Sequence, residues 1–301
     1  MKLHENTETF KEAIAQAADY CGLEEALVEK DYYVTLFLNR LNEIVPHLLF
    51  KGGTSLSKCH KIIDRFSEDI DLTLDSDHQT HGQRKQLKAD IIKVCDELGL
   101  KLLNEEEIRS RRDYNCYIVE YPIKYPSHHV KPFLLIETVF MMKAFPDEQK
   151  PVTSIIAEWL EAIGNSAAMD KYELYSFNIR VQTLARTLVD KVFAICDYML
   201  DERVERQSRH IYDISRLLNV VALDENLKIL AKEVREERKS LKKSYSAQDG
   251  VDVPKLLREI VDNHVYKKDY EDNTQELLTK RVTYEEAIQA IETIITSCVF
   301  K

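Results

Sequence analysis

Apolar residues recur at helical spacing along the first part of the chain and then give way to a short apolar run. Residues 7–20 (TETFKEAIAQAADY) predict one helix, which ends at Gly22, and residues 23–45 predict one or two more. The run at residues 48–50 predicts a first strand, and residues 55–63 predict the helix that leaves it. The chain therefore begins with helices before it enters a sheet.

Alternating and continuous apolar runs in the middle of the chain predict further strands. The predicted strands are residues 67–74, 116–124 and 133–141, with a weaker candidate at 174–181. Residues 84–98 have helical spacing and separate the first two of these strands. The order of the elements therefore mixes helices and strands.

The pattern changes after Pro146 and Pro151, where helical spacing becomes dominant. The predicted helices of this part are residues 153–164, 182–200, 203–218 and 284–298. We therefore expect two domains, one of residues 1–150 that contains the sheet and one of residues 151–301 that is mainly helical. The whole chain has only 7 Gly and 7 Pro, which also favours long helices over an all-β fold.

Composition narrows the class of protein. With 301 residues, 44% of them hydrophobic and 31% charged, the chain reads as a folded protein of one large or two modest domains. Its formal net charge of -10 argues against a protein that coats polyanions, so any nucleic-acid contact must come from local basic patches.

The 6 cysteines lack the spacing of a metal or redox site, which favours reduced thiols. The N-terminal residues lack the apolar core of a signal peptide, and no run approaches the length of a membrane span, so we expect a cytoplasmic protein without membrane contact.

The stretch LFKGGTSLSK places two consecutive glycines, Gly52 and Gly53, directly after the first predicted strand. Glycine lets backbone N–H groups approach an anion closely, because it has no side chain and adopts conformations that other residues avoid. Thr54 and Ser55 follow, and their hydroxyls can cap the next helix or donate to a phosphate. The sequence therefore predicts a phosphate-binding turn at these four residues.

Two aspartates occupy alternate positions of the next predicted strand. Residues two apart in a strand project from the same face, so Asp69 and Asp71 should lie side by side while Ile70 and Leu72 point into the core. Two neighbouring carboxylates repel each other unless a cation lies between them, and oxygen-rich sites suit magnesium. A phosphate-binding turn next to a carboxylate pair indicates phosphoryl-transfer chemistry.

Two histidines lie in the polar segment that follows this strand. His78 and His81 belong to the stretch DSDHQTHGQ, which has the composition of a loop. No cysteine and no second metal-binding motif lies near them in the sequence. We therefore interpret them as loop histidines and not as metal ligands.

Three segments carry a resemblance to a known family. GGTSL (residues 52–56), RFSEDIDL (residues 65–72) and the upstream EKDYYVT (residues 29–35) resemble the signature of nucleotidyltransferases related to DNA polymerase β. More narrowly, they resemble the AbiEii/AbiGii-type nucleotidyltransferase toxins of bacterial type IV toxin–antitoxin and abortive-infection systems. This resemblance implies an α+β fold, in which a polymerase-β-like mixed sheet with N-terminal helices precedes a C-terminal helical domain that closes over the active-site cleft.

The resemblance also implies a reaction and its participants. A nucleoside triphosphate (NTP) would bind at the glycine turn, and Mg²⁺ or Mn²⁺ held by Asp69 and Asp71 would assist transfer of a nucleoside monophosphate with release of pyrophosphate. The implied acceptor is RNA, in particular the 3′ end of a tRNA. The family further implies a toxin that is restrained by a separately encoded antitoxin.

A third metal ligand is implied on a neighbouring strand. Glu137 is the sole carboxylate in the apolar run FLLIETVFM, where a charge is costly unless it is used. Enzymes of this superfamily often take a third ligand from such a strand, and Glu137 has that context. Two alternatives stay open, namely a glutamate that faces solvent at the edge of the sheet and a partner for a lysine.

The second half of the chain carries the other implied site residues. The resemblance matches Lys191, in LARTLVDKVFAICD, to the lysine of the family's third motif and Asp213, in YDI, to the aspartate of the fourth. Relatives commonly have Arg-Asp before this segment, whereas this chain has Arg209 and His210. The functional acid is therefore Asp213 or a residue that His210 replaces. Lys191 would neutralise the triphosphate as a point charge, unless it is a surface lysine whose stem alone is buried.

Two interpretations of a different kind remain. The protein could be a catalytically silent module that binds a nucleotide or a protein, or a transferase of the same fold that modifies a protein or a small molecule. If the acceptor is RNA, basic side chains must gather locally, and we expect two such places. The first is one helix face with Arg203, Arg206, Arg209 and Arg216, and the second is Lys239, Lys242 and Lys243. A charge-balanced solvated surface is the alternative for both.

Overall fold

The structure is a computed structural model that describes residues 2–65, 67 and 69–301. Its contacts divide the chain into two compact units, which we describe separately. The sheet unit comprises Met1–Thr54, Glu68–Lys143 and Asp147–Val181. The helical unit comprises Ser55–Ser67, Ala144–Pro146 and Gln182–Lys301.

In the described part of the chain, seven strands form one sheet with the order β3-β4-β5-β2-β1-β7-β6. The strands are β1 (Leu48–Lys51), β2 (Asp69–Leu74), β3 (Lys101–Leu102), β4 (Tyr114–Glu120), β5 (Phe133–Val139), β6 (Asp147–Val152) and β7 (Phe177–Gln182). Strand β2 pairs antiparallel with β1 and parallel with β5, so the sheet is mixed. The predicted α+β fold class is confirmed, and the mixed sheet is consistent with a polymerase-β-like nucleotidyltransferase fold.

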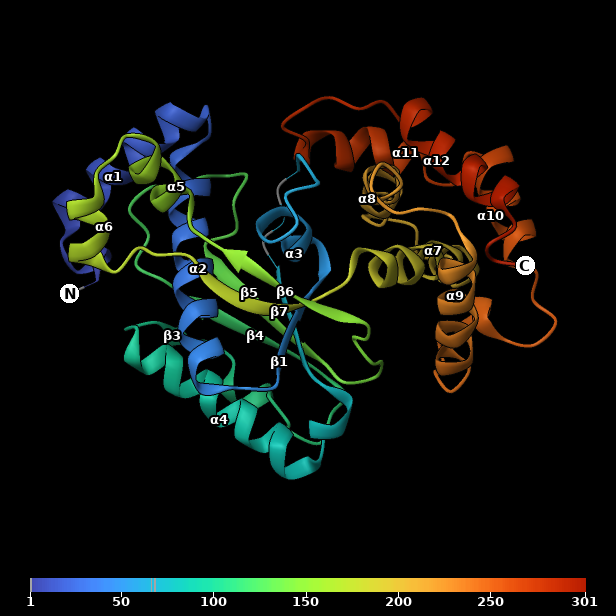
Figure 1. The fold of residues 1–301 in the computed structure, drawn as a ribbon, viewed down its shortest axis with the longest axis horizontal. Helices are drawn as coiled ribbons and strands as arrows, with labels where there is room; N and C mark the ends of the chain where they lie inside the picture. Colours follow the sequence, from blue (N-terminus) through green and yellow to red (C-terminus); the bar gives the residue numbers. More distant parts are fainter. Residues whose placement is uncertain (1, 66, 68) are drawn as a thin grey trace. The chain divides into compact units, whose positions relative to one another are not determined.

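Helices pack beside this sheet in the same unit. They are α1 (Thr7–Cys21), α2 (Glu25–Ile44), α4 (His81–Glu97), α5 (Ile155–Ala162) and α6 (Ser166–Tyr172). Figure 1 shows α1, α5 and α6 gathered beside α2, and α1 contacts both α2 and α5. Helix α1 ends as predicted at Gly22, whose φ of 65° is the left-handed conformation that glycine adopts without strain. Its N-cap is Asn6, which accepts a hydrogen bond from the backbone N–H of Thr9.

The helical unit has its own apolar core. Its helices are α7 (Leu184–Leu200), α8 (Arg209–Leu217), α9 (Glu225–Arg238), α10 (Val253–Asp262), the short α11 (Lys267–Asp269) and α12 (Tyr284–Ser297). Fully buried side chains of α7, α8 and α12, among them Leu188, Val192, Ile211 and Ile291, pack together in this core. Helix α8 contacts both α7 and α12. The packing places one face of α7 and one face of α8 against each other inside the unit.

Several boundaries differ from the sequence prediction. Helix α3 (Gly52–Lys58) starts at the first glycine of the motif, whereas the sequence predicted a helix over 55–63. Strand β6, with the sequence DEQKPV, was not predicted, because an edge strand tolerates charged residues and proline that a central strand excludes.

Among the described residues, no helix combines the length and apolar composition that a membrane crossing requires.

Candidate functional site

The two aspartates of the motif lie on one face of β2. Asp69 and Asp71 are partly exposed, whereas the alternating residues Ile70 and Leu72 are fully buried. This arrangement follows from the two-residue period of a strand, because the buried face anchors the strand and leaves the other face for the carboxylates. The structure thus brings the predicted pair together.

Glu137 lies beside this pair on the neighbouring strand. The register of the parallel β2–β5 pairing sets Asp71 opposite Glu137. Paired strands are about 4.8 Å apart, so partners in register project side by side from the same face of the sheet. The Tyr114 hydroxyl of β4 donates a hydrogen bond of 2.9 Å to Glu137 Oε1, which orients this carboxylate. Three carboxylates from two strands therefore share one face.

Two residues of β4 that the sequence analysis did not single out border these carboxylates. Cys116 pairs in register with Glu137, and Tyr114 lies two residues before it. Burial, followed by the charge of Glu137, raises the pKa of the Cys116 thiol to about 11, and both causes also raise the pKa of the Tyr114 hydroxyl. Both groups therefore stay neutral at physiological pH. The two-residue period of β4 could have predicted that Tyr114 and Cys116 lie on the same face of the sheet as Glu137.

A lysine also approaches the carboxylates. The Lys131 ammonium lies 4.0 Å from Asp69 Oδ1. The backbone carbonyl of Lys131 accepts a hydrogen bond of 3.1 Å from Lys30, whose side chain is 1% exposed. Lys30 is therefore not on a solvated helix face, and its side chain supports the backbone of Lys131.

The neighbours of Lys30 in the EKDYYVT segment anchor other parts of the unit. Glu29 is fully buried and accepts hydrogen bonds from the backbone N–H groups of Lys124 and Tyr125, at 2.8 and 2.9 Å. Asp31 accepts a hydrogen bond of 2.8 Å from the backbone N–H of Ile155, at the start of α5. This segment therefore fixes loop and helix positions around the sheet.

The first glycine of the motif lies against the second aspartate. Gly52 has a φ of 79°, and a Cβ atom built on it would lie 1.8 Å from Asp71 Oδ2. The Asp71 carboxylate thus occupies the space that any other residue at position 52 would fill. The hydroxyl of Thr54 donates a hydrogen bond of 2.6 Å to the backbone carbonyl of Asp69, which ties α3 to β2. The glycine turn is therefore packed directly against the strand that carries the two aspartates.

These donors fit a divalent metal ion of the magnesium type. Asp69, Asp71 and Glu137 offer carboxylate oxygens on one face, and hard cations such as Mg²⁺ and Mn²⁺ prefer oxygen ligands. The carboxylates repel one another, and a divalent cation between them would remove that repulsion. The donor set thus fits a hard divalent cation.

The other two predicted residues meet inside the helical unit. Asp213 on α8 is fully buried and accepts hydrogen bonds of 2.6 and 2.8 Å from Nε and Nη2 of Arg65. The Lys191 ammonium of α7 lies 2.7 Å from Asp213 Oδ2. Burial alone would raise the pKa of Asp213, but the charges of Arg65 and Lys191 outweigh it and hold the pKa well below its usual range. One carboxylate therefore joins two cations in a buried network.

His210, the departure from the family pattern, also contacts this network. Its Nδ1 atom lies 3.3 Å from the Lys191 ammonium, and its ring stacks on Tyr198 with an angle of 6° between the planes. Burial of the ring, followed by the charges of Lys191 and Arg209, lowers the pKa of His210 well below 6.5. The imidazole is therefore neutral at pH 7 and accepts a hydrogen bond from Lys191.

The arginines that were predicted to share one helix face do not do so. Helix α8 begins at Arg209, so Arg203 and Arg206 lie in the turns before it. Arg206 has a φ of 60°, and its backbone N–H donates to the buried carboxylate of Asp269. Arg216 is on α8, but its guanidinium donates to the carbonyl of Ile62 within the unit. The prediction failed because helical spacing continues through the turns that precede α8.

The site residues thus form two groups in different units. Gly52, Gly53 and Thr54 belong to the sheet unit with the three carboxylates, and Lys191 and Asp213 belong to the helical unit, as does Ser55. Ser55 is fully buried. Phe66 and Glu68 of the RFSEDIDL motif lie outside the described residues.

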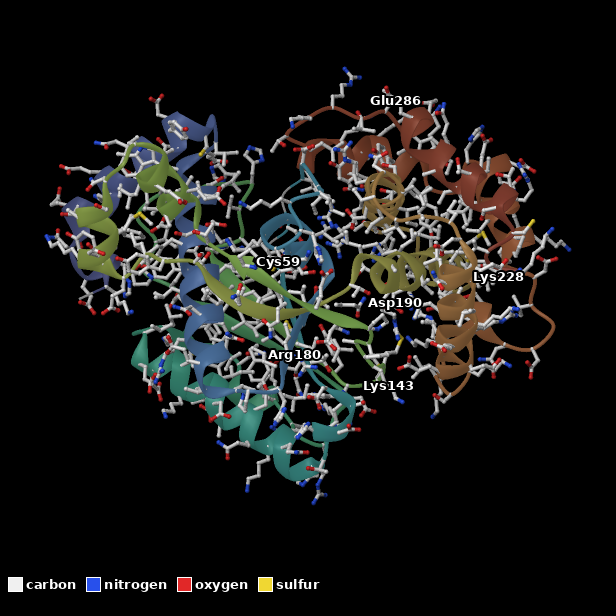
Figure 2. The ribbon with its side chains drawn as sticks, viewed as in Figure 1. Cys59, Lys143, Arg180, Asp190, Lys228 and Glu286 are labelled. Carbon is white, nitrogen blue, oxygen red and sulfur yellow. The ribbon has the colours of Figure 1, made fainter. Side chains whose placement is uncertain are left out.

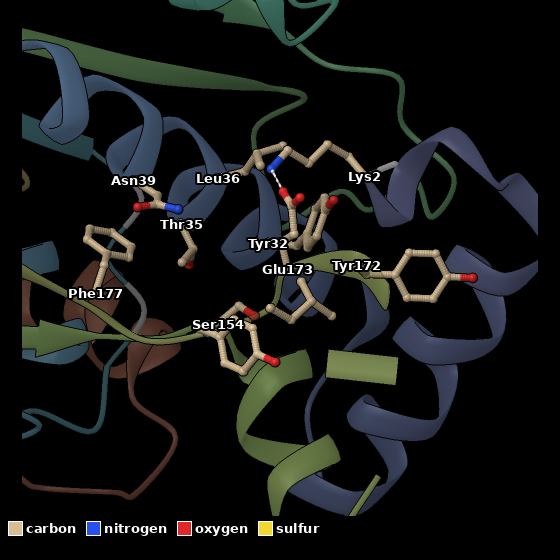
Figure 3. Close-up of a pocket in the computed structure, with 11 residues that line it drawn as sticks. Lys2, Tyr32, Thr35, Leu36, Asn39, Ser154, Tyr172, Glu173 and Phe177 are labelled. Carbon is tan, nitrogen blue, oxygen red and sulfur yellow. Dashed lines mark hydrogen bonds and ion pairs between the residues drawn. The ribbon is translucent and has the colours of Figure 1, made fainter. Parts of the chain in front are cut away.

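Two hollows of the sheet unit differ in size. The first, shown in Figure 3, lies where the Lys2–Glu173 ion pair of 2.6 Å spans the surface near Tyr32 and Ser154. It encloses about 30 Å³, roughly the space of one water molecule, and cannot hold a nucleotide. The second measures about 470 Å³. It is lined by Gln79, His81, Arg84, Ser110 and Arg111.

Comparison with known proteins agrees with this geometry. A search of the curated proteins found no match. A family model described as "Nucleotidyl transferase AbiEii toxin, Type IV TA system" matches residues 36–296, which include both groups of site residues. The chain belongs to the AbiEii family of nucleotidyl transferase toxins of type IV toxin–antitoxin systems.

Proposed function

We propose that the protein transfers a nucleoside monophosphate from a nucleoside triphosphate to RNA, with the 3′ end of a tRNA as the acceptor. The observation that carries this proposal is the cluster of Asp69, Asp71 and Glu137 on adjacent strands, next to the glycine turn. Neighbouring carboxylates repel one another, and a divalent cation bound between them would lower that repulsion. Its partial exposure leaves it accessible from solvent.

Each residue has a proposed task. Asp69, Asp71 and Glu137 hold Mg²⁺ or Mn²⁺, which supplies charge neutralisation at the reacting phosphate. The backbone N–H groups of the turn from Gly52 through Gly53 and Thr54 to Ser55 hold the phosphates of the NTP. The close packing of Gly52 against Asp71 would set the distance between the phosphate-binding turn and the metal-binding carboxylates.

The helical unit contributes the remaining charge. We assign Lys191 to the triphosphate, as a point charge that neutralises its oxygens. Asp213 and His210 hold the ammonium of Lys191 at 2.7 and 3.3 Å, so its direction is fixed before a nucleotide binds. In this assignment Asp213 acts through Lys191 and is a positioning residue.

The acceptor would bind through a local basic surface. The hollow of about 470 Å³ in the sheet unit carries the guanidinium groups of Arg84 and Arg111 and the imidazole of His81. Arg84 is held by Asp113 at 2.7 Å and lies 4.6 Å from the ring centre of Phe140. Guanidinium groups bind phosphates with paired hydrogen bonds. This hollow would let a protein of net negative charge bind the phosphates of RNA.

The family description supports a proposal for the cellular setting. We infer that the protein acts in the cytoplasm as a toxin, and that a separately encoded antitoxin restrains it. Induced expression should then stop growth, and coexpression of the neighbouring antitoxin gene should restore it. The Asp71→Ala variant should not stop growth at all.

The decisive experiment supplies the purified protein and Mg²⁺ with each labelled triphosphate and with total RNA, total protein or small metabolites as acceptor. We expect label in the tRNA fraction, lost in Asp71→Ala and retained in Asp77→Ala, an exposed acid outside the cluster. Label in protein or in a small molecule would support the same fold with another acceptor. Nucleotide binding without any transfer would support a silent binding module.

A further inference from the structure

A second group of possible metal ligands lies at the other end of β2. His47, Asp75 and His78 each offer one ligand atom, and these atoms all lie within 4.8 Å of one another. The Nδ1 atom of His47 lies 3.3 Å from Asp75 Oδ2, and the Nδ1 atom of His78 is in close contact with Asp75 Oδ1. Asp75 is four residues beyond Asp71, which corresponds to about 13 Å along a strand. The group is therefore separate from the carboxylates of the proposed active site.

The sheet itself holds these residues in place. Strands β1 and β2 pair antiparallel with Leu48 opposite Leu74, so the next positions outward, His47 and Asp75, face each other. The backbone N–H of Asp75 donates a hydrogen bond of 3.1 Å to the carbonyl of His47. The short helix Ser76–His78 then turns the chain back, and the N–H of His78 donates to the carbonyl of Asp75 at 3.0 Å. The arrangement thus depends on backbone geometry and not on long flexible side chains.

A further layer of contacts orients the carboxylate. Arg180 of β7, labelled in Figure 2, donates hydrogen bonds of 3.0 Å to Asp75 Oδ2 and of 2.9 Å to Asp147. Outer partners of this kind fix the direction of a metal-binding carboxylate and are typical of real metal sites. Asp75 Oδ2 therefore contacts both Arg180 and His47, and Asp75 Oδ1 contacts His78.

The donor set indicates the class of ion. Two imidazole nitrogens and one carboxylate oxygen suit Zn²⁺ and neighbouring transition metals, whereas Mg²⁺ prefers oxygen ligands alone. We propose that His47, Asp75 and His78 bind one transition-metal ion, with Zn²⁺ as the physiological candidate. Three protein ligands leave a coordination position for water or an external ligand. The ion would fasten the connection between α2 and β1 to the end of β2.

Binding requires a small movement of the two rings. The imidazoles of His47 and His78 stack with their centres 3.3 Å apart and an angle of 9° between their planes. A bound metal lies in the plane of each imidazole that ligates it, so the rings must tilt apart to share one ion. Their side chains are 42% and 34% exposed, which leaves room for this rotation.

The test is a titration of the metal-free full-length protein with Co²⁺, followed by its visible absorption, and then displacement by Zn²⁺. We expect one saturable band, and a loss of affinity of at least about tenfold in His47→Ala and in His78→Ala. The matched control is His81→Ala, three residues after His78 and bonded instead to Ser110 at 3.4 Å, which should bind as wild type. Zn²⁺ should raise the melting temperature of the wild type but not that of His47→Ala, because it binds the folded state.

One more variant separates this site from the proposed active site. The double variant Asp69→Ala/Asp71→Ala should keep the Co²⁺ band, even though it lacks transfer activity. Loss of the band in that variant would overturn the separate site, as would its persistence in His47→Ala/His78→Ala. A wild-type protein without a saturable band would refute the proposal outright. None of these outcomes depends on whether the protein transfers nucleotides.

Discussion

The carboxylates of the sheet unit and the carboxylate of the helical unit occupy opposite surroundings. Asp69, Asp71 and Glu137 lie partly exposed on adjacent strands, and the Lys131 ammonium lies 4.0 Å from Asp69 Oδ1. Asp213 is fully buried and lies within hydrogen-bonding distance of both Arg65 and Lys191. The sequence motifs present all of these acids as members of one site.

This difference indicates two uses of the same functional group. A buried carboxylate with two cationic partners is satisfied within the protein, and its removal leaves those cations without compensation. A cluster of partly exposed carboxylates repels itself, and an added cation lowers its energy. We therefore expect the first arrangement to position other groups and the second to bind a cation from solvent. Each prediction below tests whether this division is real.

The largest effect should follow removal of one acid from the exposed cluster. Asp69→Ala and Asp71→Ala should each lower transfer by at least about 10²-fold, the scale for loss of one stabilising group at a reacting centre. Their melting temperature without metal should stay equal to that of wild type or rise, because one of the repelling charges is gone. Labelled-nucleotide transfer and thermal unfolding measure the two effects. Wild-type turnover in either variant would refute the metal assignment.

Removal of the buried carboxylate should act on stability first. Asp213→Asn should lower the free energy of unfolding by about 3–5 kcal/mol, because Arg65 and Lys191 stay buried without their counter-charge. The control is Asp201→Asn, whose partner Arg203 is exposed and whose ion pair is worth at most about 1 kcal/mol. Urea unfolding measures both. An equal decrease in the free energy of unfolding of the two variants would show that the buried network stabilises the fold no more than the exposed ion pair does.

The contact between glycine and aspartate provides a test of geometry within the exposed cluster. Gly52→Ala places a methyl group where Asp71 Oδ2 lies and adds the cost of a left-handed conformation, about 1–2 kcal/mol. The control Gly22→Ala has the same conformational cost, but no atom lies within 4 Å of the added Cβ. Only Gly52→Ala should lose transfer, since only there must Asp71 move. Comparable activity in both variants would show that the position of Asp71 is not critical.

The sequence predicted the exposed cluster well because local periodicity determines it. Alternation along β2 places Asp69 and Asp71 on one face, and the burial of Ile70 and Leu72 confirms that alternation. Glu137 was singled out as the lone acid of an apolar run and by the family resemblance. Most strands of the sheet and most helices of its unit were predicted from apolar patterns, whereas β3 and β6 were not.

The buried network was not predicted, since its partners are remote in sequence. Arg65 and Asp213 are separated by 148 residues, and no local pattern indicates that they meet. His47 similarly meets His78 only through the pairing of β1 with β2, and the sequence alone indicated a loop histidine at His78. The buried Lys30 likewise contacts the carbonyl of Lys131, which is 101 residues away in the sequence. Contacts set by tertiary pairing thus remained hidden.

Lys191 belongs to the buried network and is also the residue that we assign to the triphosphate. If it binds the triphosphate, Lys191→Met should weaken nucleotide binding by about 1–3 kcal/mol, the range for a lost charged hydrogen bond. Lys228→Met, on α9 and labelled in Figure 2, is the control and should bind nucleotide as wild type. Titration calorimetry of the folded variants measures the affinity. Unchanged affinity together with lowered stability would make Lys191 a purely structural partner of Asp213.

The smallest effect concerns His210 and the pH dependence of stability. Burial first, and then the charges of Lys191 and Arg209, lower the pKa of His210 in the folded state, while Asp213 opposes the shift. In the unfolded chain the imidazole takes up its proton near pH 6.5, whereas the folded protein resists protonation there. The unfolded state then binds more protons, so stability is complete above about pH 6.5 and falls as the pH is lowered.

One such group gives a slope of at most about 1.4 kcal/mol per pH unit below pH 6.5, and His210→Asn should reduce the measured slope by that share. Urea unfolding between about pH 5 and 8 measures it. Equal slopes in wild type and His210→Asn would show that the ring of His210 accepts a proton in the folded state. The buried network would then tolerate a third cation, and its contrast with the exposed carboxylates would be weaker than the geometry indicates.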